Sequence, residues 1–87
     1  MREERFDAGK RLAIQKARVM AADEGVMITR IRWDTEGRIA TADLQIETPE
    51  KKTHGLVQQE WLEELPSGTY SPVLDATLRA LVRSLRQ

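Results

Sequence analysis

Residues 26–48 read VMITRIRWDTEGRIATADLQIET and contain the clearest strand pattern in the chain. The first part, residues 26–33, is rich in β-branched side chains and becomes alternating as it proceeds. Residues 34–37 are typical of a turn, with Gly37 at a position that needs a positive φ. Residues 38–48 then return as a second strand. We therefore predict an antiparallel β-hairpin in this part of the chain.

The length of the hairpin loop sets which residues face each other across the two strands. A loop of two or four residues makes one face of both strands apolar, whereas a three-residue loop with a glycine bulge scrambles that face and is disfavoured. A four-residue loop shifts each partner by two residues relative to the two-residue loop and keeps the same faces. The two-residue loop gives these partners: Trp33 with Ala40, Ile31 with Ala42, Thr29 with Leu44, Met27 with Ile46 and, on the other face, Arg30 with Asp43.

A helix is predicted before the hairpin, over residues 2–23. This segment contains no proline and is rich in alanine, arginine, lysine and glutamate, which favour helix. The helix should end at Gly25, because glycine readily adopts the left-handed conformation that follows a helix. When these residues are placed on a helix, the apolar side chains fall on one side of it. They are Phe6, Ala13, Ile14, Ala17, Met20 and Ala21.

The C-terminal part of the chain carries the strongest helix signals. Ser71 is a good N-cap and Pro72 suits the first helical position. Asp75 and Arg79, four residues apart, are predicted to form an ion pair on the polar side. The apolar seam of this helix has helical spacing: Leu74, Leu78, Leu81 and Leu85.

The segment between hairpin and last helix has two interpretations. Residues 53–59 suit a third antiparallel strand, whereas Val57, Trp61 and Leu65, spaced by four, suit a short helix that ends before Pro66. We favour a strand followed by a helical turn, because a lone hairpin would cover the helices poorly. The sequence thus predicts one α+β domain over residues 1–87, with both long helices on one face of a small antiparallel sheet.

Length and composition exclude several classes of protein. The chain has 87 residues, 14 basic and 14 acidic side chains, and no cysteine, which excludes disulfides, thiolate metal sites and cysteine nucleophiles. So short a chain buries a smaller share of its surface than a larger domain does, and oligomerisation is a common source of further burial. The charged start does not resemble a signal peptide and no apolar run is long enough to span a membrane, so we expect a cytoplasmic protein.

Signals for catalysis are scarce. His54 is the only histidine, and Glu60, Glu63 and Glu64 have the spacing of an ordinary helical surface. No nucleotide-binding, nucleophile-elbow or zinc-protease motif occurs, and the five glycines are interpreted as element ends, turns or spacers. We predict no catalytic, cofactor-binding or metal-binding residue, and an enzyme that uses His54 or Glu60 is the third hypothesis.

A nucleic-acid-binding module is the second hypothesis. The order helix, three strands, helix resembles the double-stranded-RNA-binding domain, a resemblance of element order alone that covers most of the chain. That family uses a lysine cluster at the start of its second helix, whereas residues 71–75 here contain no lysine. The candidate phosphate contacts are basic residues on or beside the hairpin: Arg30, Arg32, Lys51 and Lys52.

A non-catalytic interaction or regulatory module is the first hypothesis. Leu12 and Val19 lie seven residues apart, outside the main apolar arc of the first helix, and form a second, narrower stripe. Such a stripe either packs against other elements or binds a partner. We predict a homodimer, or binding of another protein, through Leu12 and Val19 or through a sheet edge. The sequence does not identify the partner.

Overall fold

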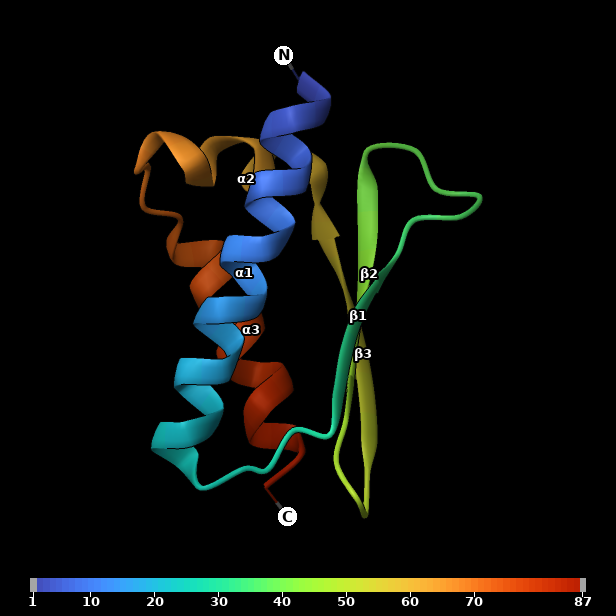
Figure 1. Ribbon diagram of the computed structural model, residues 1–87, viewed down its shortest axis with the longest axis vertical. Helices are drawn as coiled ribbons and strands as arrows, with labels where there is room; N and C mark the ends of the chain where they lie inside the picture. The colour runs from blue at the N-terminus through green and yellow to red at the C-terminus, as the bar shows by residue number, and fades with distance from the viewer. Residues whose placement is uncertain (1, 87) are drawn as a thin grey trace.

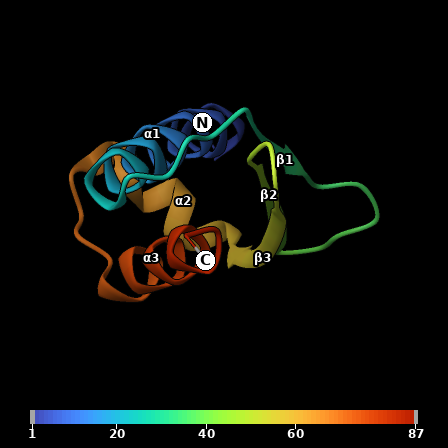
Figure 2. The same ribbon diagram turned by 90° about the horizontal axis from the view of Figure 1, so that it is seen from below.

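The computed structural model describes residues 2–86 and has two layers, a sheet and a layer of helices (Figures 1 and 2). The strands pair antiparallel in the order β1-β2-β3, and α1 and α3 cover one face of the sheet. This arrangement confirms the predicted α+β fold and its element order. The elements are α1 (Arg2–Glu24), β1 (Arg30–Asp34), β2 (Thr41–Glu47), β3 (Lys52–Gln58), α2 (Gln59–Glu64), η1 (Leu65–Ser67) and α3 (Pro72–Ser84).

Helix α1 ends at Gly25, as predicted. Gly25 has φ +71°, and its N–H donates to Ala22 O at 3.3 Å, while Val26 N–H donates to Ala21 O at 2.8 Å. These two bonds form a Schellman motif, which satisfies carbonyls that the last helical turn would leave without partners. The chain then turns towards the sheet, and β1 begins at Arg30 rather than at residue 26.

The predicted hairpin exists, but its loop is wider than both the two-residue and the four-residue loop, and each partner is shifted by four residues from the two-residue prediction. Trp33 faces Leu44 and Ile31 faces Ile46, and Arg30 faces Glu47 instead of Asp43. Because the shift is an even number of residues, the faces are as predicted and the apolar side chains still point towards the helices. The predicted pairing of Met27 with Ile46 is wrong, because Met27 precedes β1 and is 71% exposed.

The wider loop, residues 35–40, has two physical causes. It sets the bulky side chains of Trp33 and Leu44 opposite each other, where the tight turn would have put Ala40 beside Trp33. The end of the loop is also bound from outside the hairpin, since Gln59 N–H donates to Ala40 O at 2.8 Å while Ala40 adopts a left-handed φ of 63°. The loop projects away from the body of the protein (Figure 2).

The favoured interpretation of the middle segment, a strand followed by a helical turn, is confirmed, and the alternative helix that includes Val57 is wrong because Val57 lies in β3. β3 pairs with β2 along its whole length and α2 follows it without a break. Gly55 of β3 lies under α3, and a Cβ at this position would lie 3.0 Å from Leu81 Cδ2. The absence of a side chain at Gly55 therefore allows α3 to pack closely on the edge strand.

The core lies between the sheet and the helices and is aliphatic. Trp33, at its margin, donates from Nε1 to Lys10 O of α1 at 3.1 Å, which ties β1 to the first helix. Burial of the aliphatic core side chains is the main source of stability in a chain of this size. The fully buried side chains of largest volume are Leu44, Ile46, Leu62, Leu74, Leu78, Val57 and Val82.

Helix α3 begins and packs as predicted. Ser71 Oγ accepts a hydrogen bond from Leu74 N–H at 3.2 Å, and all four leucines of the predicted seam are buried. The predicted pair of Asp75 with Arg79 is wrong, because Asp75 Oδ1 pairs instead with Lys16 Nζ of α1 at 3.0 Å. This ion pair joins the two long helices and leaves Arg79 without an ion pair within residues 2–86.

Glu24, in the last turn of α1, is held by Arg83 in the last turn of α3 and by Arg86 just beyond that helix. Its carboxylate accepts hydrogen bonds from Arg86 Nη1 and, at 3.5 Å, from Arg83 Nε. The hydrogen bond from Arg86 is the main cause of a lowered pKa for the Glu24 carboxyl, and Arg83 lowers that pKa further. Ion pairs therefore connect the C-terminal ends of the two long helices.

A pH series should isolate this contact. Because the folded state lowers the pKa of Glu24, its carboxylate stabilises the fold above the ordinary value of 4.5, and this contribution is lost as the pH falls through the lower folded value. Wild type should therefore have a slightly higher Tm than Glu24→Gln at neutral pH, and the difference should shrink towards zero in acid. A Tm difference that is the same at every pH would contradict this account.

Candidate functional site

An open groove lies between α1 and α3, on the helical side of the protein. Its volume is about 520 Å³, and no strand residue lines it. Apolar side chains form much of its wall, and polar and charged groups form its rim. The lining residues are Leu12, Gln15, Lys16, Val19, Met20, Asp23, Leu65 and Arg79.

The two residues of the predicted stripe both line this groove, but they differ in exposure. Val19 is 62% exposed. Leu12 is half-buried and packs against the core, so that it belongs partly to the fold itself. The two side chains therefore have different uses in an experiment: a change at Val19 reports on the surface, whereas a change at Leu12 also disturbs packing.

The rim of the groove carries three ionisable groups with different partners. Lys16 is paired with Asp75 at 3.0 Å. Asp23 and Arg79 form no ion pair with any residue in the range 2–86. The groove thus has one free acidic group and one free basic group beside its apolar wall.

A second hollow, of about 350 Å³, lies on the face of the sheet that the helices leave open. Side chains on this face form three rows across the strands, each row with one residue from each strand. The first row is Asp34, Asp43 and Leu56; the second row is Arg32, Gln45 and His54; the third row is Arg30, Glu47 and Lys52.

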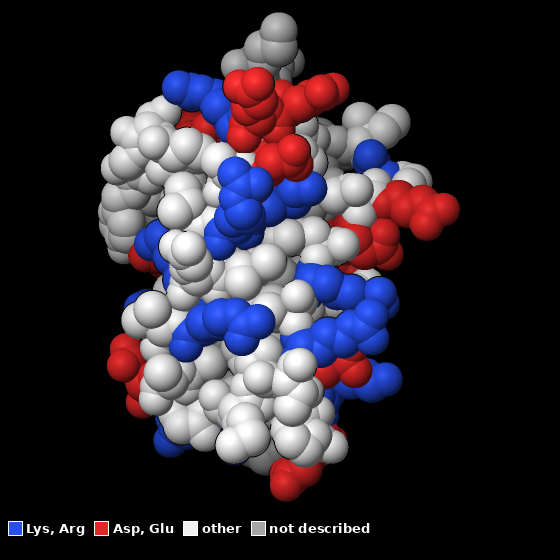
Figure 3. All heavy atoms as spheres, in the orientation of Figure 1, with Lys and Arg blue, Asp and Glu red and all other residues white. Residues whose placement is uncertain are grey.

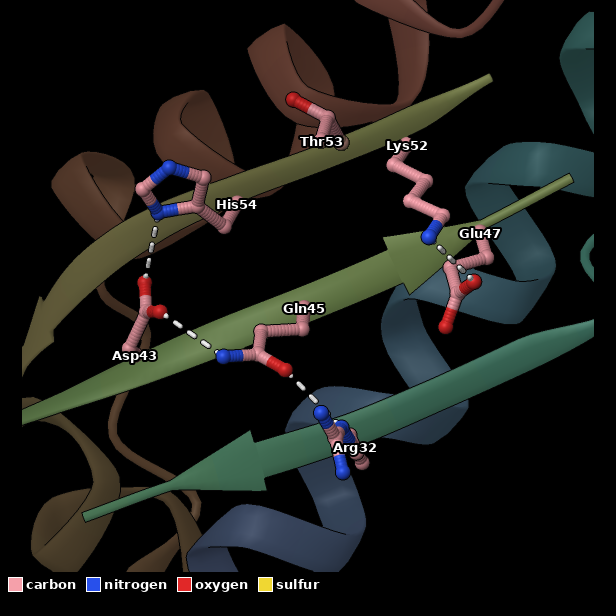
Figure 4. A pocket seen from close by; sticks show the side chains of 7 residues that line it. All are labelled: Arg32, Asp43, Gln45, Glu47, Lys52, Thr53 and His54. Carbon is pink, nitrogen blue, oxygen red and sulfur yellow. Dashed lines mark hydrogen bonds and ion pairs between the residues drawn. The ribbon is translucent and has the colours of Figure 1, made fainter. Parts of the chain in front are cut away.

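A chain of hydrogen bonds links the second row to Asp43 (Figure 4). His54 Nδ1 lies 3.1 Å from Asp43 Oδ1, Gln45 Nε2 donates to Asp43 Oδ2 at 3.2 Å, and Arg32 Nε donates to Gln45 Oε1 at 2.8 Å. Because a carboxylate only accepts, His54 donates from Nδ1 in this arrangement. Asp43 is 4% exposed although it lies on the open face, and both of its oxygens have partners.

The candidate nucleic-acid contacts are only partly brought together. Arg30, Arg32 and Lys52 share the open face, whereas Lys51 lies in the turn before β3. Glu47 lies between Arg30 and Lys52: its Oε2 is 3.9 Å from Arg30 Nε, and its Oε1 is 3.7 Å from Lys52 Nζ. Acidic side chains also interrupt the basic ones over the surface drawn in Figure 3, which views the sheet from its edge.

The pair of His54 with Asp43 was not predicted from the sequence, which gave His54 no partner. A signal for it exists. If residues 48–51 form a four-residue turn, His54 lies opposite Gln45 and diagonal to Asp43, within reach of a histidine ring. The glutamates weighed for catalysis, Glu60, Glu63 and Glu64, belong to α2 and do not line the hollow that contains His54.

Within the range that the structure describes, no three histidine, aspartate or glutamate side chains are grouped so as to hold a metal ion. No helix among the same residues is both long enough and apolar enough to cross a membrane. No protein family, curated protein or solved structure matches the chain. The function is therefore inferred from the groove and from the open sheet face.

Proposed function

We propose that this chain is a non-catalytic interaction module that forms a homodimer through the groove between α1 and α3. The observation that carries the proposal is the exposed apolar wall of the groove, with Val19 62% exposed beside Leu12, Met20 and Leu65. Apolar surface that lines a hollow and is rimmed by polar groups is typical of an interaction site. A domain of this size also has few other ways to bury more of its surface.

The rim charges favour a second copy of the chain as the occupant. In a two-fold interface the same surface meets itself, so that residue i faces residue j of the partner and residue j faces residue i. Asp23 and Arg79, the two rim groups that lack an ion pair within residues 2–86, have opposite charges. A dimer would pair Asp23 with the partner's Arg79 twice, and no other ligand needs to be invoked to satisfy both.

The stripe on α1 suits the same geometry. Leu12 and Val19 are separated by two helical turns and therefore point to the same side of α1. When two copies of α1 pack side by side about a two-fold axis that runs along the helix, Leu12 lies beside the partner's Leu12 and Val19 beside the partner's Val19. The same arrangement brings the partner's Arg79 near the level of Asp23, because α1 and α3 run parallel, as the ion pairs Lys16–Asp75 and Glu24–Arg83 show.

Val19→Glu is expected to convert the dimer to monomer, because the change would bury a carboxylate against an apolar wall. Val73→Glu is the matched control: it makes the same change at a valine that is 54% exposed and lies outside the groove. Molar mass should be measured for both variants by light scattering at several protein concentrations. The proposed interface would be contradicted if both variants changed the molar mass equally. It would also be contradicted if the wild type were a dimer and Val19→Glu remained one.

A charge exchange tests the pairing across the two-fold axis. Asp23→Arg alone and Arg79→Asp alone should each weaken the dimer, since each places like charges opposite each other. The double variant should recover most of the wild-type association. Failure of the double variant to recover would show that Asp23 and Arg79 do not meet in the dimer.

A further inference from the structure

The charges on the open face of the sheet are sorted by row. The first row contains both aspartates. The second and third rows contain three basic groups, Arg30, Arg32 and Lys52, against the single carboxylate of Glu47. The whole face is nearly balanced in charge, yet the part above the second and third rows has an excess of positive charge.

The acceptors of Asp43 and Gln45 are already used, the Glu47 carboxylate is engaged by the ion pairs with Arg30 and Lys52, and donors remain. Asp43 accepts from His54 and Gln45, and Gln45 Oε1 accepts from Arg32 Nε. Arg32 keeps its two terminal nitrogens, and Lys52, whose side chain is 83% exposed, has only the 3.7 Å contact with Glu47. Because guanidinium and ammonium groups donate and never accept, a ligand at these residues must supply acceptor atoms.

Arg32 is also held in position without a ligand. Its Nε–H donates to Gln45 Oε1, and Gln45 is held in turn by the buried carboxylate of Asp43. The terminal nitrogens of a guanidinium fixed in this way can contact two oxygens of one oxyanion, with less loss of side-chain freedom than a mobile arginine would suffer. Figure 4 shows the Arg32 side chain beside Gln45 and that of Lys52, on the strand at the other side of β2, directed towards Glu47.

We infer that the open sheet face binds a small oxyanion, a carboxylate or a phosphate group, above Gln45. Arg32 supplies the bidentate contact and Lys52 a second charge. His54, oriented by Asp43, lies at the far end of the same row, opposite Arg32. A single oxyanion contacts the face at one point, beside Glu47, whereas a nucleic acid extends further and would also meet Asp34. The site lies on the opposite side of the sheet from the helices, so the inference is independent of the proposed dimer.

Titration with inorganic phosphate and with acetate, followed by amide NMR at constant ionic strength, tests this inference. At least one of the two anions should cause saturable shifts at the amides of residues 32, 45, 52 and 54, and chloride should not. Saturation by phosphate alone assigns the site to phosphate groups, and saturation by acetate alone assigns it to carboxylates. The absence of saturable shifts with both anions would overturn the inference.

Two variants and a control separate a defined site from general charge attraction. Arg32→Gln should weaken the binding about tenfold, the effect expected for loss of one charge-assisted pair. Lys52→Gln should weaken it less, and its exposed side chain leaves the fold intact. Arg38→Gln removes the same charge from the loop after β1, outside the hollow, and should leave binding unchanged. Equal losses for Arg32→Gln and Arg38→Gln would overturn the defined site.

Discussion

Gly9→Ala is expected to destabilise the protein by about 3 kcal/mol or more, or to prevent folding. Gly9 is buried in α1 where that helix crosses α2, and a Cβ on it would lie 1.8 Å from Leu62 O and 2.5 Å from Leu62 C. Both atoms belong to backbone, so the two helices would have to separate. The gain in helix propensity, about 1 kcal/mol, is too small to offset this. Urea denaturation followed by circular dichroism measures the effect.

Gly55→Ala provides the control for this prediction. Its new Cβ would meet Leu81 Cδ2 at 3.0 Å, which is the far end of a flexible side chain rather than backbone. Leu81 can change rotamer, so the cost should be clearly smaller than at Gly9. If the two variants lost equal stability, or if Gly9→Ala were as stable as wild type, the close crossing of α1 and α2 would be wrong.

Leu44→Ala is expected to lower the free energy of unfolding by about 2–5 kcal/mol. Leu44 is fully buried on the central strand, faces Trp33 and Gly55 on the neighbouring strands, and belongs to the core shared by α1 and α3. Removing most of its side chain leaves a cavity that a sheet fixed on both sides cannot close. The free energy of unfolding from urea denaturation is again the measurement.

Leu56→Ala makes the same change on the adjacent strand and the opposite face. Leu56 is 53% exposed and faces Asp43, so its loss should cost no more than about 1 kcal/mol. The contrast between the two leucines tests which face of the sheet the helices cover. A greater loss at Leu56 than at Leu44 would reverse that assignment.

The local features of the fold were predictable because each depends on residues close together in sequence. Ser71 and Pro72 mark the start of α3, and Gly25 marks the end of α1 by a motif that needs only neighbouring carbonyls. The faces of the hairpin followed from alternation alone. These are signals that tertiary contacts reinforce rather than create.

The hairpin register was not predictable from the hairpin. Every even shift keeps the same apolar face, so the pattern leaves several registers equally good. The choice is made by contacts from outside, such as Gln59 N–H with Ala40 O and the packing of Trp33 beneath α1. Because the predicted register placed Asp43 opposite Arg30, the actual neighbours of Asp43 were not predicted either.

The two candidate surfaces were predictable to different degrees. Helical periodicity placed Leu12 and Val19 on one stripe, but it could not show that Leu12 packs against the core while Val19 stays exposed. Gly9 was interpreted as a spacer, since nothing in its neighbours in sequence indicates that α2 crosses there. Contacts between residues this far apart in sequence become visible only in the folded structure.

Dimer formation through the α1–α3 groove is the central claim, and the molar mass of the wild-type protein tests it most directly. Light scattering behind size exclusion, at several concentrations and two salt levels, should give a mass approaching twice the 9.9 kDa of the chain as concentration rises. High salt should shift the equilibrium towards monomer, because the proposed Asp23–Arg79 pairs are screened. A mass that stays at 9.9 kDa at every concentration would contradict the claim.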